Sequence, residues 1–363
     1  MGDKLRIVQV ISSSVPSGAE HQVALLARQF QQKGHEVTVV CPPGGWLPEA
    51  LRNQNTPCWE MPMRKGGSFF THLKLLRRLK RSKFDIIHTH LTRGAWHGGI
   101  TATLRRIPIV ASVHVINHDV AFNLIPKTGG RLIAVSEFVK ENLISNKVPA
   151  NAIDVVYHGT EFADSNTQCS KVGVFEEFGI AENYRIIGLV GRVASDKGHL
   201  LAVQAIPKVL AKHKDTHFMF VGRVEPNFSP LLEKAIDDLG IRKAVTLTGN
   251  RSDVSRLMDA MDIMILPSKI ETFGLVVIEA MGRGKPVIAT RVGGLPEVIQ
   301  NNLTGLFIEQ EPDELADAIN SLLSDPSRSK AMGEAGREWV RSRFNVPRMI
   351  EETEAIYRKM VKD

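Results

Sequence analysis

The feature that most constrains the fold is a double series of short apolar runs, which alternate with stretches of helical period. In the first half the runs fall at 5–11, 36–41, 84–88, 109–114, 132–136 and 153–157. In the second half they fall at 184–190, 217–221, 245–248, 263–266, 286–290 and 305–308. Short buried strands between helices are typical of parallel sheets that helices cover on both faces. The sequence therefore predicts an α/β protein made of two Rossmann-like domains, with ligands bound at the carboxyl ends of the strands.

The length of the chain also indicates two domains. A chain of 363 residues is longer than one ordinary hydrophobic core supports. A polar, weakly periodic segment at 159–171 separates the two series of strands and is the predicted linker. We therefore expect one domain at 1–163, a second at 164–344, and a C-terminal helix at 345–363.

One segment of the second half combines a strand, a tight polar turn and a helix start. The strand is 263–266, and the helix start offers backbone N–H groups at Phe273, Gly274 and Leu275. Free N–H groups and the positive end of a helix dipole suit a phosphate. Glu271 in the turn and Glu279 on the helix supply carboxylates, which accept hydrogen bonds from sugar hydroxyls. A phosphate-binding helix start between two carboxylates that accept hydrogen bonds predicts a nucleotide-sugar site. Either glutamate alone could be an ordinary surface charge.

A second, independent segment upstream supports this interpretation. Gly191 and Arg192 end the run 184–190, and Lys197 stands before the next helix. Arginine binds phosphate oxygens in pairs and lysine adds a point charge, so the two could neutralise a diphosphate leaving group. The alternative is that both are solvated charges near a helix start.

Together these segments resemble the retaining glycosyltransferases of family 4, also called the group 1 glycosyltransferases. Glu271 to Glu279 is similar to the E-x7-E signature of the family, and Arg192 and Lys197 match its phosphate-binding Arg and Lys. The resemblance continues through 282–289 and 293–297, and weaker matches extend over the first half.

This resemblance implies the GT-B fold, in which a cleft lies between two Rossmann-like domains and the last helix packs back on the first. The first domain would bind the acceptor and the second the nucleotide-sugar donor. Arg192 and Lys197 would stabilise charge on the departing diphosphate. Glu271 would contact the sugar hydroxyls and Glu279 the ribose.

The resemblance also assigns residues of the first domain. Ser17 and Gly18 stand where the family has a Gly-Gly loop near the donor phosphate and the acceptor, and a left-handed backbone at Ser17 would be strained. His114 ends the fourth strand, where the family often places an active-site histidine beside the transferred sugar. Asn117 and His118 lie just beyond it and are expected to line the acceptor site.

The base of the donor has one candidate contact, Asn250 and Arg251, after the run 245–248. A UDP-sugar is expected in preference to a GDP-sugar. The predicted reaction is retaining transfer to a glycan or lipid-linked acceptor, in the synthesis of cell-surface polysaccharide, lipopolysaccharide or glycolipid. Two alternatives stay open: a GT-B sugar-nucleotide epimerase, and a non-catalytic module that binds sugar nucleotides or membranes.

No cofactor or metal is expected beyond the donor co-substrate. Neither first strand is followed by G-x-G-x-x-G, and no D-x-D pair occurs. His88 and His90 would share one face of a strand, but no third ligand is evident, so we expect satisfied histidines there.

The positive charge is concentrated in the first domain. Residues 1–165 carry a formal charge of +8 and the remainder carries −1. Lys74, Arg77, Arg78 and Arg81 fall on one face of an amphipathic helix, which could lie on anionic lipid or pack against the sheet. Nucleic acid is not expected as a partner, because interleaved aromatic residues are missing.

Three cysteines without metal-ligand spacing predict a reducing compartment. No signal peptide or membrane-spanning run is recognisable. We therefore expect a cytoplasmic protein that touches the inner face of the membrane at most peripherally.

Overall fold

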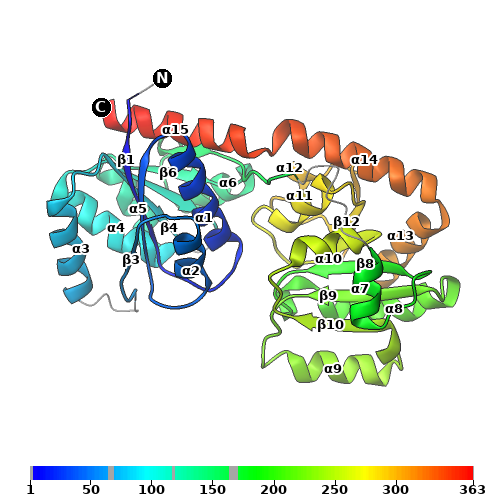
Figure 1. The fold of residues 1–363 in the computed structure, drawn as a ribbon. Helices are drawn as coiled ribbons and strands as arrows, with labels where there is room; N and C mark the ends of the chain where they lie inside the picture. The colour runs from blue at the N-terminus through cyan, green and yellow to red at the C-terminus, as the bar shows by residue number, and fades with distance from the viewer. Residues whose placement is uncertain (1–2, 64–68, 117–118, 163–170, 363) are drawn as a thin grey trace. The chain divides into compact units, whose positions relative to one another are not determined.

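The computed structural model describes residues 3–63, 69–116, 119–162 and 171–362, with the backbone alone at 69, 70 and 81. The chain divides into two compact units, Met1–His158 with Val346–Asp363, and Gly159–Asn345. Each unit is a parallel sheet covered by helices (Figure 1), so the predicted α/β class is confirmed.

Among the described residues, the first unit holds a seven-stranded sheet of order β3-β2-β1-β4-β5-β6-β7. Its strands are β1 (Arg6–Ile11), β2 (Glu36–Cys41), β3 (Cys58–Glu60), β4 (Ile86–His90), β5 (Ile109–Val113), β6 (Arg131–Ala134) and β7 (Ile153–Val155). The order reverses between β1 and β4, which pair in parallel from Ile7 opposite Ile86 to Ile11 opposite His90. Such a switch point is where parallel sheets bind ligands.

Helices cover this sheet. They are α1 (Gly18–Gln32), α2 (Trp46–Asn53), α3 (Phe69–Arg81), α4 (Thr92–Arg105), α5 (Val120–Lys127), α6 (Glu137–Ser145), the short η1 (Ala150–Ala152) and α15 (Val346–Lys362). Val23, Ala27 and Phe30 of α1 are fully buried at helical spacing, and Tyr357 of α15 is buried in the same core. The C-terminal helix therefore belongs to the core of the first unit.

The second unit repeats the strand order in six strands within the described part of the chain, β10-β9-β8-β11-β12-β13. They are β8 (Arg185–Val190), β9 (Thr216–Val221), β10 (Val245–Gly249), β11 (Ile263–Leu266), β12 (Val287–Thr290) and β13 (Gly305–Ile308). Strands β9, β11 and β12 are buried along their whole length. The order reverses between β8 and β11.

The helices of this unit are α7 (Lys171–Phe178), η2 (Ser195–Lys197), α8 (His199–Lys212), α9 (Ser229–Asp238), η3 (Arg242–Ala244), α10 (Val254–Ala260), α11 (Leu275–Gly282), α12 (Leu295–Val298), α13 (Pro312–Ser324) and α14 (Pro326–Arg343). They bury two apolar clusters against the sheet. In the described ranges, no helix has the length and apolar character that crossing a bilayer requires.

The predicted strands match the structure closely, with one omission. Strands at 36–41, 263–266 and 305–308 have the predicted bounds, and the other predicted strands differ by one or two residues at one or both ends. The three-residue strand β3 was not predicted. It lies at the edge of the sheet, pairs only through Val39–Cys41, and its sequence Cys-Trp-Glu has no apolar run.

Candidate functional site

In the second unit the loops after β8 and β11 are held together, because these strands are neighbours at the switch point. The Lys269 N–H donates to the Asp196 carbonyl at 2.8 Å. Gly198 has φ of 75°, and a Cβ atom there would lie 1.9 Å from the carbonyl oxygen of Pro267. The close approach of the two loops therefore requires glycine at this position.

This loop pairing brings together two residues that the sequence predicts for the site, the cation of Lys197 and the carboxylate of Glu271. Lys197 Nζ lies 2.6 Å from Glu271 Oε1, and Ser268 Oγ donates to the same oxygen at 3.0 Å. The two side chains of the ion pair are 21% and 12% exposed. A hydroxyl and an ammonium thus fix one oxygen of the Glu271 carboxylate.

Arg192 stands in the same loop with weaker constraints. Its guanidinium pairs with Asp196 at 3.1 Å and with Glu225, and it is 41% exposed. Exposed pairs of this kind are worth about 0–1 kcal/mol. Arg192 can therefore exchange these carboxylates for the oxygens of an anionic ligand at little cost.

A second glycine loop closes over the backbone of Glu271. The Gly294 N–H donates to the Glu271 carbonyl at 3.0 Å. Gly293 has φ of 55°, and a Cβ atom there would lie 1.7 Å from the same carbonyl oxygen. The segment 293–294 thus sets the position of the loop that carries Glu271.

Helix α11 begins directly after this loop. Gly274, with φ of 94°, precedes its first residue, Leu275. Phe273 is buried, and its ring packs edge-on against Phe344 at 5.6 Å. Among the predicted donor contacts, Phe273 can therefore offer only its backbone, while its side chain anchors the helix start.

Glu279 lies one turn further along α11 and is partly buried. Burial raises the pKa of this carboxyl to about 7, although Arg283 opposes the shift. Near neutral pH the group exists in both forms, and both can bind a hydroxyl group.

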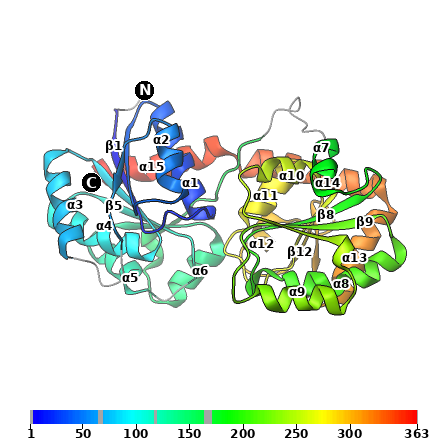
Figure 2. The ribbon, with the colours of Figure 1, turned by 60° about the horizontal axis from the view of Figure 1, so that its bottom comes forward.

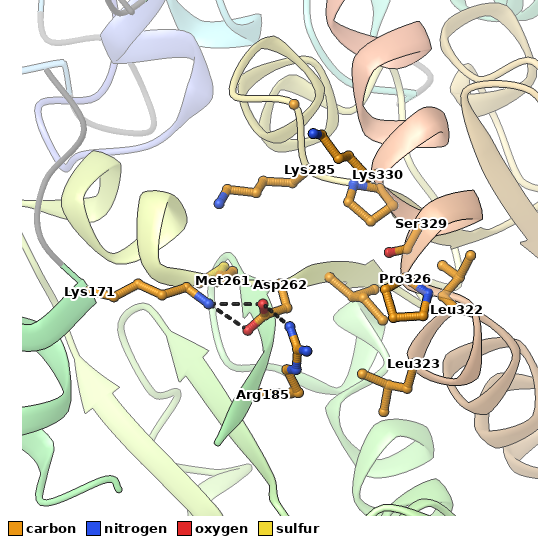
Figure 3. A pocket seen from close by; sticks show the side chains of 13 residues that line it. Lys171, Arg185, Met261, Asp262, Lys285, Leu322, Leu323, Pro326, Ser329 and Lys330 are labelled. Atoms are coloured by element: carbon orange, nitrogen blue, oxygen red, sulfur yellow. Dashed lines mark hydrogen bonds and ion pairs between the residues drawn. The ribbon is translucent and has the colours of Figure 1, made fainter. Parts of the chain in front are cut away.

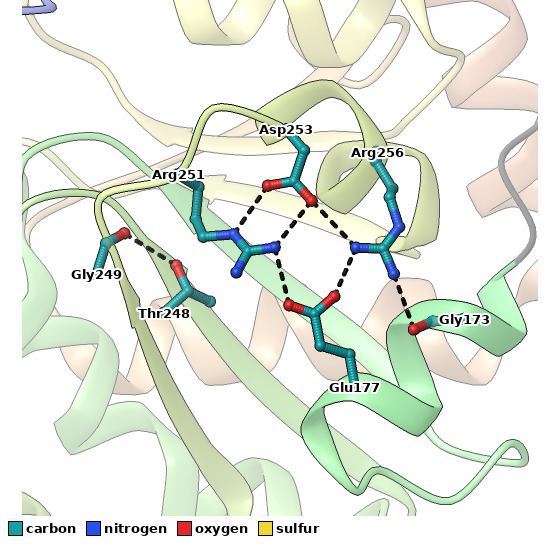
Figure 4. A network of polar contacts seen from close by, with 7 residues as sticks. All are labelled: Gly173, Glu177, Thr248, Gly249, Arg251, Asp253 and Arg256. Carbon is teal, nitrogen blue, oxygen red and sulfur yellow. Dashed lines mark hydrogen bonds and ion pairs between the residues drawn. The ribbon is translucent and has the colours of Figure 1, made fainter.

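Arg251 is engaged in an ion-pair network, shown in Figure 4. Its Nε donates to Asp253 at 2.8 Å and its guanidinium pairs with Glu177 of α7 at 2.8 Å. Arg256 contacts the same two carboxylates at 3.0 and 2.6 Å. Hydrogen bonds from Arg251, with Arg256, lower the pKa of Asp253 to about 2. The network leaves the predicted base contact to exposed Asn250 and to the backbone of this loop.

A cavity of 220 Å³ lies at the opposite edge of the same sheet, at the amino ends of β8, β11 and β12. Figure 3 shows Asp262 between Lys171, at 2.8 Å, and Arg185, at 3.4 Å. The Ile186 N–H also donates to Asp262, at 2.9 Å. Asp262 therefore ties α7 to the sheet, and this cavity is separate from the carboxyl ends where the site residues gather.

In the first unit, the loop after β1 ends at Ser17 and Gly18, the N-cap and first residue of α1. Ser17 is extended, with φ of −153°, so the strain expected of a left-handed serine does not arise. Its hydroxyl donates to Glu20, which is buried in the first turn of the helix. The loop is thus held by a side-chain bond within α1.

His114 follows β5 and stands in a row of imidazoles. His90 Nδ1 lies 3.2 Å from His114 Nε2, and the rings of His114 and His158 stack at 5.3 Å with 7° between their planes. Burial lowers the pKa of His114 to about 4 and that of His90 and His158 well below the ordinary value. Three neutral imidazoles therefore gather at the carboxyl ends of β4, β5 and β7.

His88 extends the row into the core. Its ring lies 4.1 Å from that of His90, as expected for alternate residues of one strand. Its Nδ1 lies 2.5 Å from the Tyr357 hydroxyl and its Nε2 lies 2.7 Å from Ser112 Oγ. Desolvation lowers the pKa of His88 to about 3. The C-terminal helix is thereby linked to the strand pair beneath His114.

Two of the predicted acceptor residues, Asn117 and His118, lie outside the described residues. The basic helix is α3, on which Lys74, Arg77 and Arg78 are exposed, whereas Leu75 and Leu79 are buried. The side chain of Arg81 is not among those described. The predicted amphipathic face is therefore the outer face of a helix whose leucines pack inward.

Sequence reasoning did not find several partners of the site. Ser268 and Asp196 were overlooked, although both flank predicted residues in the chain. His90 was expected to be a satisfied histidine, no role was assigned to His158, and Tyr357 was missed because it is 269 residues from His88. The available signal was the recurrence of histidine at or just after the ends of three strands, β4, β5 and β7.

Comparison with known proteins identifies the family of the chain. The family described as "Glycosyltransferase Family 4" matches residues 16–163, and "Glycosyl transferases group 1" matches residues 174–339. The chain is 29% identical to the N-acetyl-alpha-D-glucosaminyl L-malate synthase of Bacillus anthracis, over 93% of each protein.

Two solved structures show the same fold. A glycosyltransferase from Rickettsia africae has a TM-score of 0.88 and 28% identity, with both chains covered completely. HepE from Anabaena, solved in complex with UDP-glucose, has a TM-score of 0.88 at 23% identity, over 98% of this chain and 100% of HepE. The fold expected from the sequence, GT-B, is thus confirmed. The family 4 match covers the first half of the chain and the group 1 match covers the second half. This protein is therefore a glycosyltransferase that belongs to family 4, the group 1 glycosyltransferases.

Proposed function

We propose that this protein is a retaining glycosyltransferase that transfers a sugar from a UDP-sugar to a glycan or lipid-linked acceptor. The observation that carries the proposal is the pairing of Lys197 with Glu271 at the switch point of the second unit, beside Arg192. Two cations next to a hydroxyl-binding carboxylate suit a sugar diphosphate. The first unit, with neutral histidines at its strand ends, suits uncharged hydroxyl groups.

The donor diphosphate would contact Arg192 and Lys197, with backbone N–H groups from the start of α11. Lys197 would share its charge between the phosphate and Glu271, whose second oxygen accepts sugar hydroxyls. Glu279 would hold the ribose, and Asn250 the base. A UDP-sugar is favoured because HepE, which shares the fold, was solved with UDP-glucose.

In the proposed reaction the bond between the anomeric carbon and the diphosphate oxygen breaks. The acceptor hydroxyl attacks the same face, so that the configuration is retained, and its proton passes to the departing diphosphate. Arg192 and Lys197 stabilise the negative charge that grows on this group. Glu271 is held by Lys197 and Ser268, which fits a binding role better than that of a nucleophile.

The first unit would hold the acceptor. Ser17 and Gly18 offer backbone at the start of α1, and His114 would position a hydroxyl of the sugar or the acceptor. Neutral imidazole can both donate and accept a hydrogen bond. Exposed Lys74, Arg77 and Arg78 of α3 favour an acceptor carried by an anionic membrane.

The test is a thermal-shift screen of the purified protein with UDP, GDP, ADP and their sugar conjugates, with and without EDTA. Ligand at one hundred times its Kd stabilises the folded state by about 2.7 kcal/mol, so binding raises Tm. We expect a rise with UDP compounds that EDTA does not remove, that Lys197→Ala abolishes and that Lys269→Ala, an exposed lysine of the neighbouring loop after β11, keeps.

Analysis of the reaction product distinguishes the proposed transferase from the alternative functions. Transfer with unchanged anomeric configuration, seen by NMR of the product, supports the proposal. An isomerised sugar nucleotide formed without acceptor would indicate an epimerase instead. Folded protein that shows no shift with any nucleotide would overturn the donor assignment.

A further inference from the structure

The exposed apolar side chains of the first unit are concentrated on two helices. Trp96, Ile100 and Leu104 follow one another at intervals of four residues along α4, and are 37%, 41% and 63% exposed. Val120 and Leu124 do the same on α5, with 58% and 40% exposed. Scattered exposed hydrophobic residues are ordinary, but stripes of them at four-residue spacing on two adjacent helices are typical of an interaction surface.

The two stripes belong to adjacent helices. α4 packs against α5 through Gly99, where an added Cβ atom would lie 3.8 Å from Ile125. On its other side α4 contacts α3: Arg105 donates to the Leu76 carbonyl at 2.8 Å, and His97 lies 3.2 Å from His72. The three helices lie next to one another on the first unit (Figure 2). We call the outer faces of α3, α4 and α5 the helical face.

The charge of this face is one-sided. The sequences of α3, α4 and α5 contain eight Lys and Arg residues and no Asp or Glu. The other α-helices described in the first unit, α1, α2, α6 and α15, contain seven basic and seven acidic residues. Lys74, Arg77, Arg93 and Lys127 are exposed, and no carboxylate of the described residues pairs with them. An apolar strip bordered by unpaired cations complements a surface with anionic headgroups above hydrocarbon.

The position of the stripes relates them to the acceptor. α4 begins two residues after β4, and α5 begins seven residues after β5, so their first turns follow strand ends at the switch-point edge of the sheet. Trp96 lies in the second turn of α4 and Val120 in the first turn of α5, and each stands six residues after a strand-end histidine, His90 or His114. A bilayer at these turns would present the headgroup of a lipid near that edge.

We propose that the helical face is a membrane-docking surface, in which Trp96, Ile100, Leu104, Val120 and Leu124 enter the lipid interface and the basic residues of α3 contact anionic headgroups. Tryptophan is suited to this depth because its ring is apolar and its N–H is polar. Docking rests on the proposed function only in one respect, the use of a lipid-linked acceptor. The membrane contact itself requires neither donor nor transfer.

The experiment is flotation of the full chain with phosphatidylcholine vesicles and with mixed phosphatidylcholine–phosphatidylglycerol vesicles, without donor. We expect binding to the mixed vesicles that falls with added salt. The triple variant Trp96→Ser, Ile100→Ser, Leu104→Ser should weaken this binding by about tenfold or more. The matched control Leu231→Ser, Leu239→Ser removes equally exposed leucines from the second unit and should bind like the wild type.

A second variant tests the contribution of charge to vesicle binding separately from that of the apolar side chains. Lys74→Glu with Arg77→Glu should reduce binding to the mixed vesicles while the melting temperature stays unchanged, since both side chains are exposed. Absence of vesicle binding, or binding that the triple variant retains, overturns the proposal. The proposal is also overturned if the wild type is a dimer in analytical ultracentrifugation and the triple variant is a monomer, because the helical face would then be a subunit contact. Wild-type protein that binds UDP but no vesicles refutes only the docking surface, and wild-type protein that binds vesicles but no UDP refutes only the proposed donor.

Discussion

The two units share a strand order but treat polar groups at the switch point in opposite ways. In the first unit the strand ends bury His88 and His90 beside His114, all held neutral by desolvation. In the second unit the corresponding edge carries paired charges, with Lys197 on Glu271 and Arg192 on acidic neighbours.

This difference would allow one topology to serve the two kinds of ligand proposed above. A buried group that stays neutral avoids the large cost of burying a charge and can still hydrogen-bond to a hydroxyl. A diphosphate instead requires cations: Arg192 is exposed and can exchange its carboxylate partners, whereas Lys197 is largely shielded and fixes Glu271. The comparison can be tested at either edge.

The largest expected effect is acid destabilisation of the first unit. Four histidines in the row have folded pKa values below the ordinary 6.5, so the unfolded chain binds more protons as pH falls from 6.5 towards 4. The free energy of unfolding of this unit should then fall by up to roughly 5 kcal/mol per pH unit. His199 and His217 of the second unit, with pKa about 4, give about half that slope.

Hydrogen exchange followed by mass spectrometry at pH 7 and pH 5 measures this difference. Peptides of β4 and β5 should lose protection before peptides of β8 and β11. Equal loss in both sheets would show that the histidine row does not control acid stability.

Next in size is Lys197→Ala, which should lower kcat by about 100- to 1000-fold, as removal of one charge-stabilising donor does elsewhere. Initial rates with the UDP-sugar found in the screen give the value. Lys269→Ala serves as the control. A ratio near unity would mean that Lys197 only positions Glu271.

A third prediction concerns the glycine loop over Glu271. Gly293→Ala should destabilise the second unit by about 2 kcal/mol more than Gly240→Ala. Both positions have positive φ, 55° and 64°, but only at 293 would the new Cβ meet a backbone atom. Urea unfolding of the two variants measures the difference, and equal losses would show that the loop simply moves aside.

The smallest effect is expected from Tyr357→Phe. The variant removes the 2.5 Å hydrogen bond between His88 Nδ1 and the Tyr357 hydroxyl in the core, which should cost about 1 kcal/mol. Tyr184→Phe removes a hydroxyl from a partly buried ring of the second unit and should change the free energy of unfolding little. If thermal unfolding shifts equally for both, the bond to α15 contributes nothing to the first unit.

Much of the site could be predicted from the sequence because its residues lie in local patterns. Gly274 before α11 and Lys197 before α8 stand at strand–helix transitions, which apolar periodicity reveals. Strand β3 escaped because an edge strand of three residues has no such period. The ion pair of Arg251 with Glu177 was not predicted, because Arg251 lies in a loop and its partner lies on a helix 74 residues away in the chain.

The sequence by itself determined the two parallel sheets, the family and the identity of the charged residues, since these follow from spacing along one chain. Only the tertiary structure decided which of them meet. Lys197 reaches Glu271 because β8 and β11 pair across the sheet, and His114 gains its imidazole neighbours because β4, β5 and β7 end at one edge. Burial then set the pKa values, because desolvation depends on what packs around a group and not on its position in the chain.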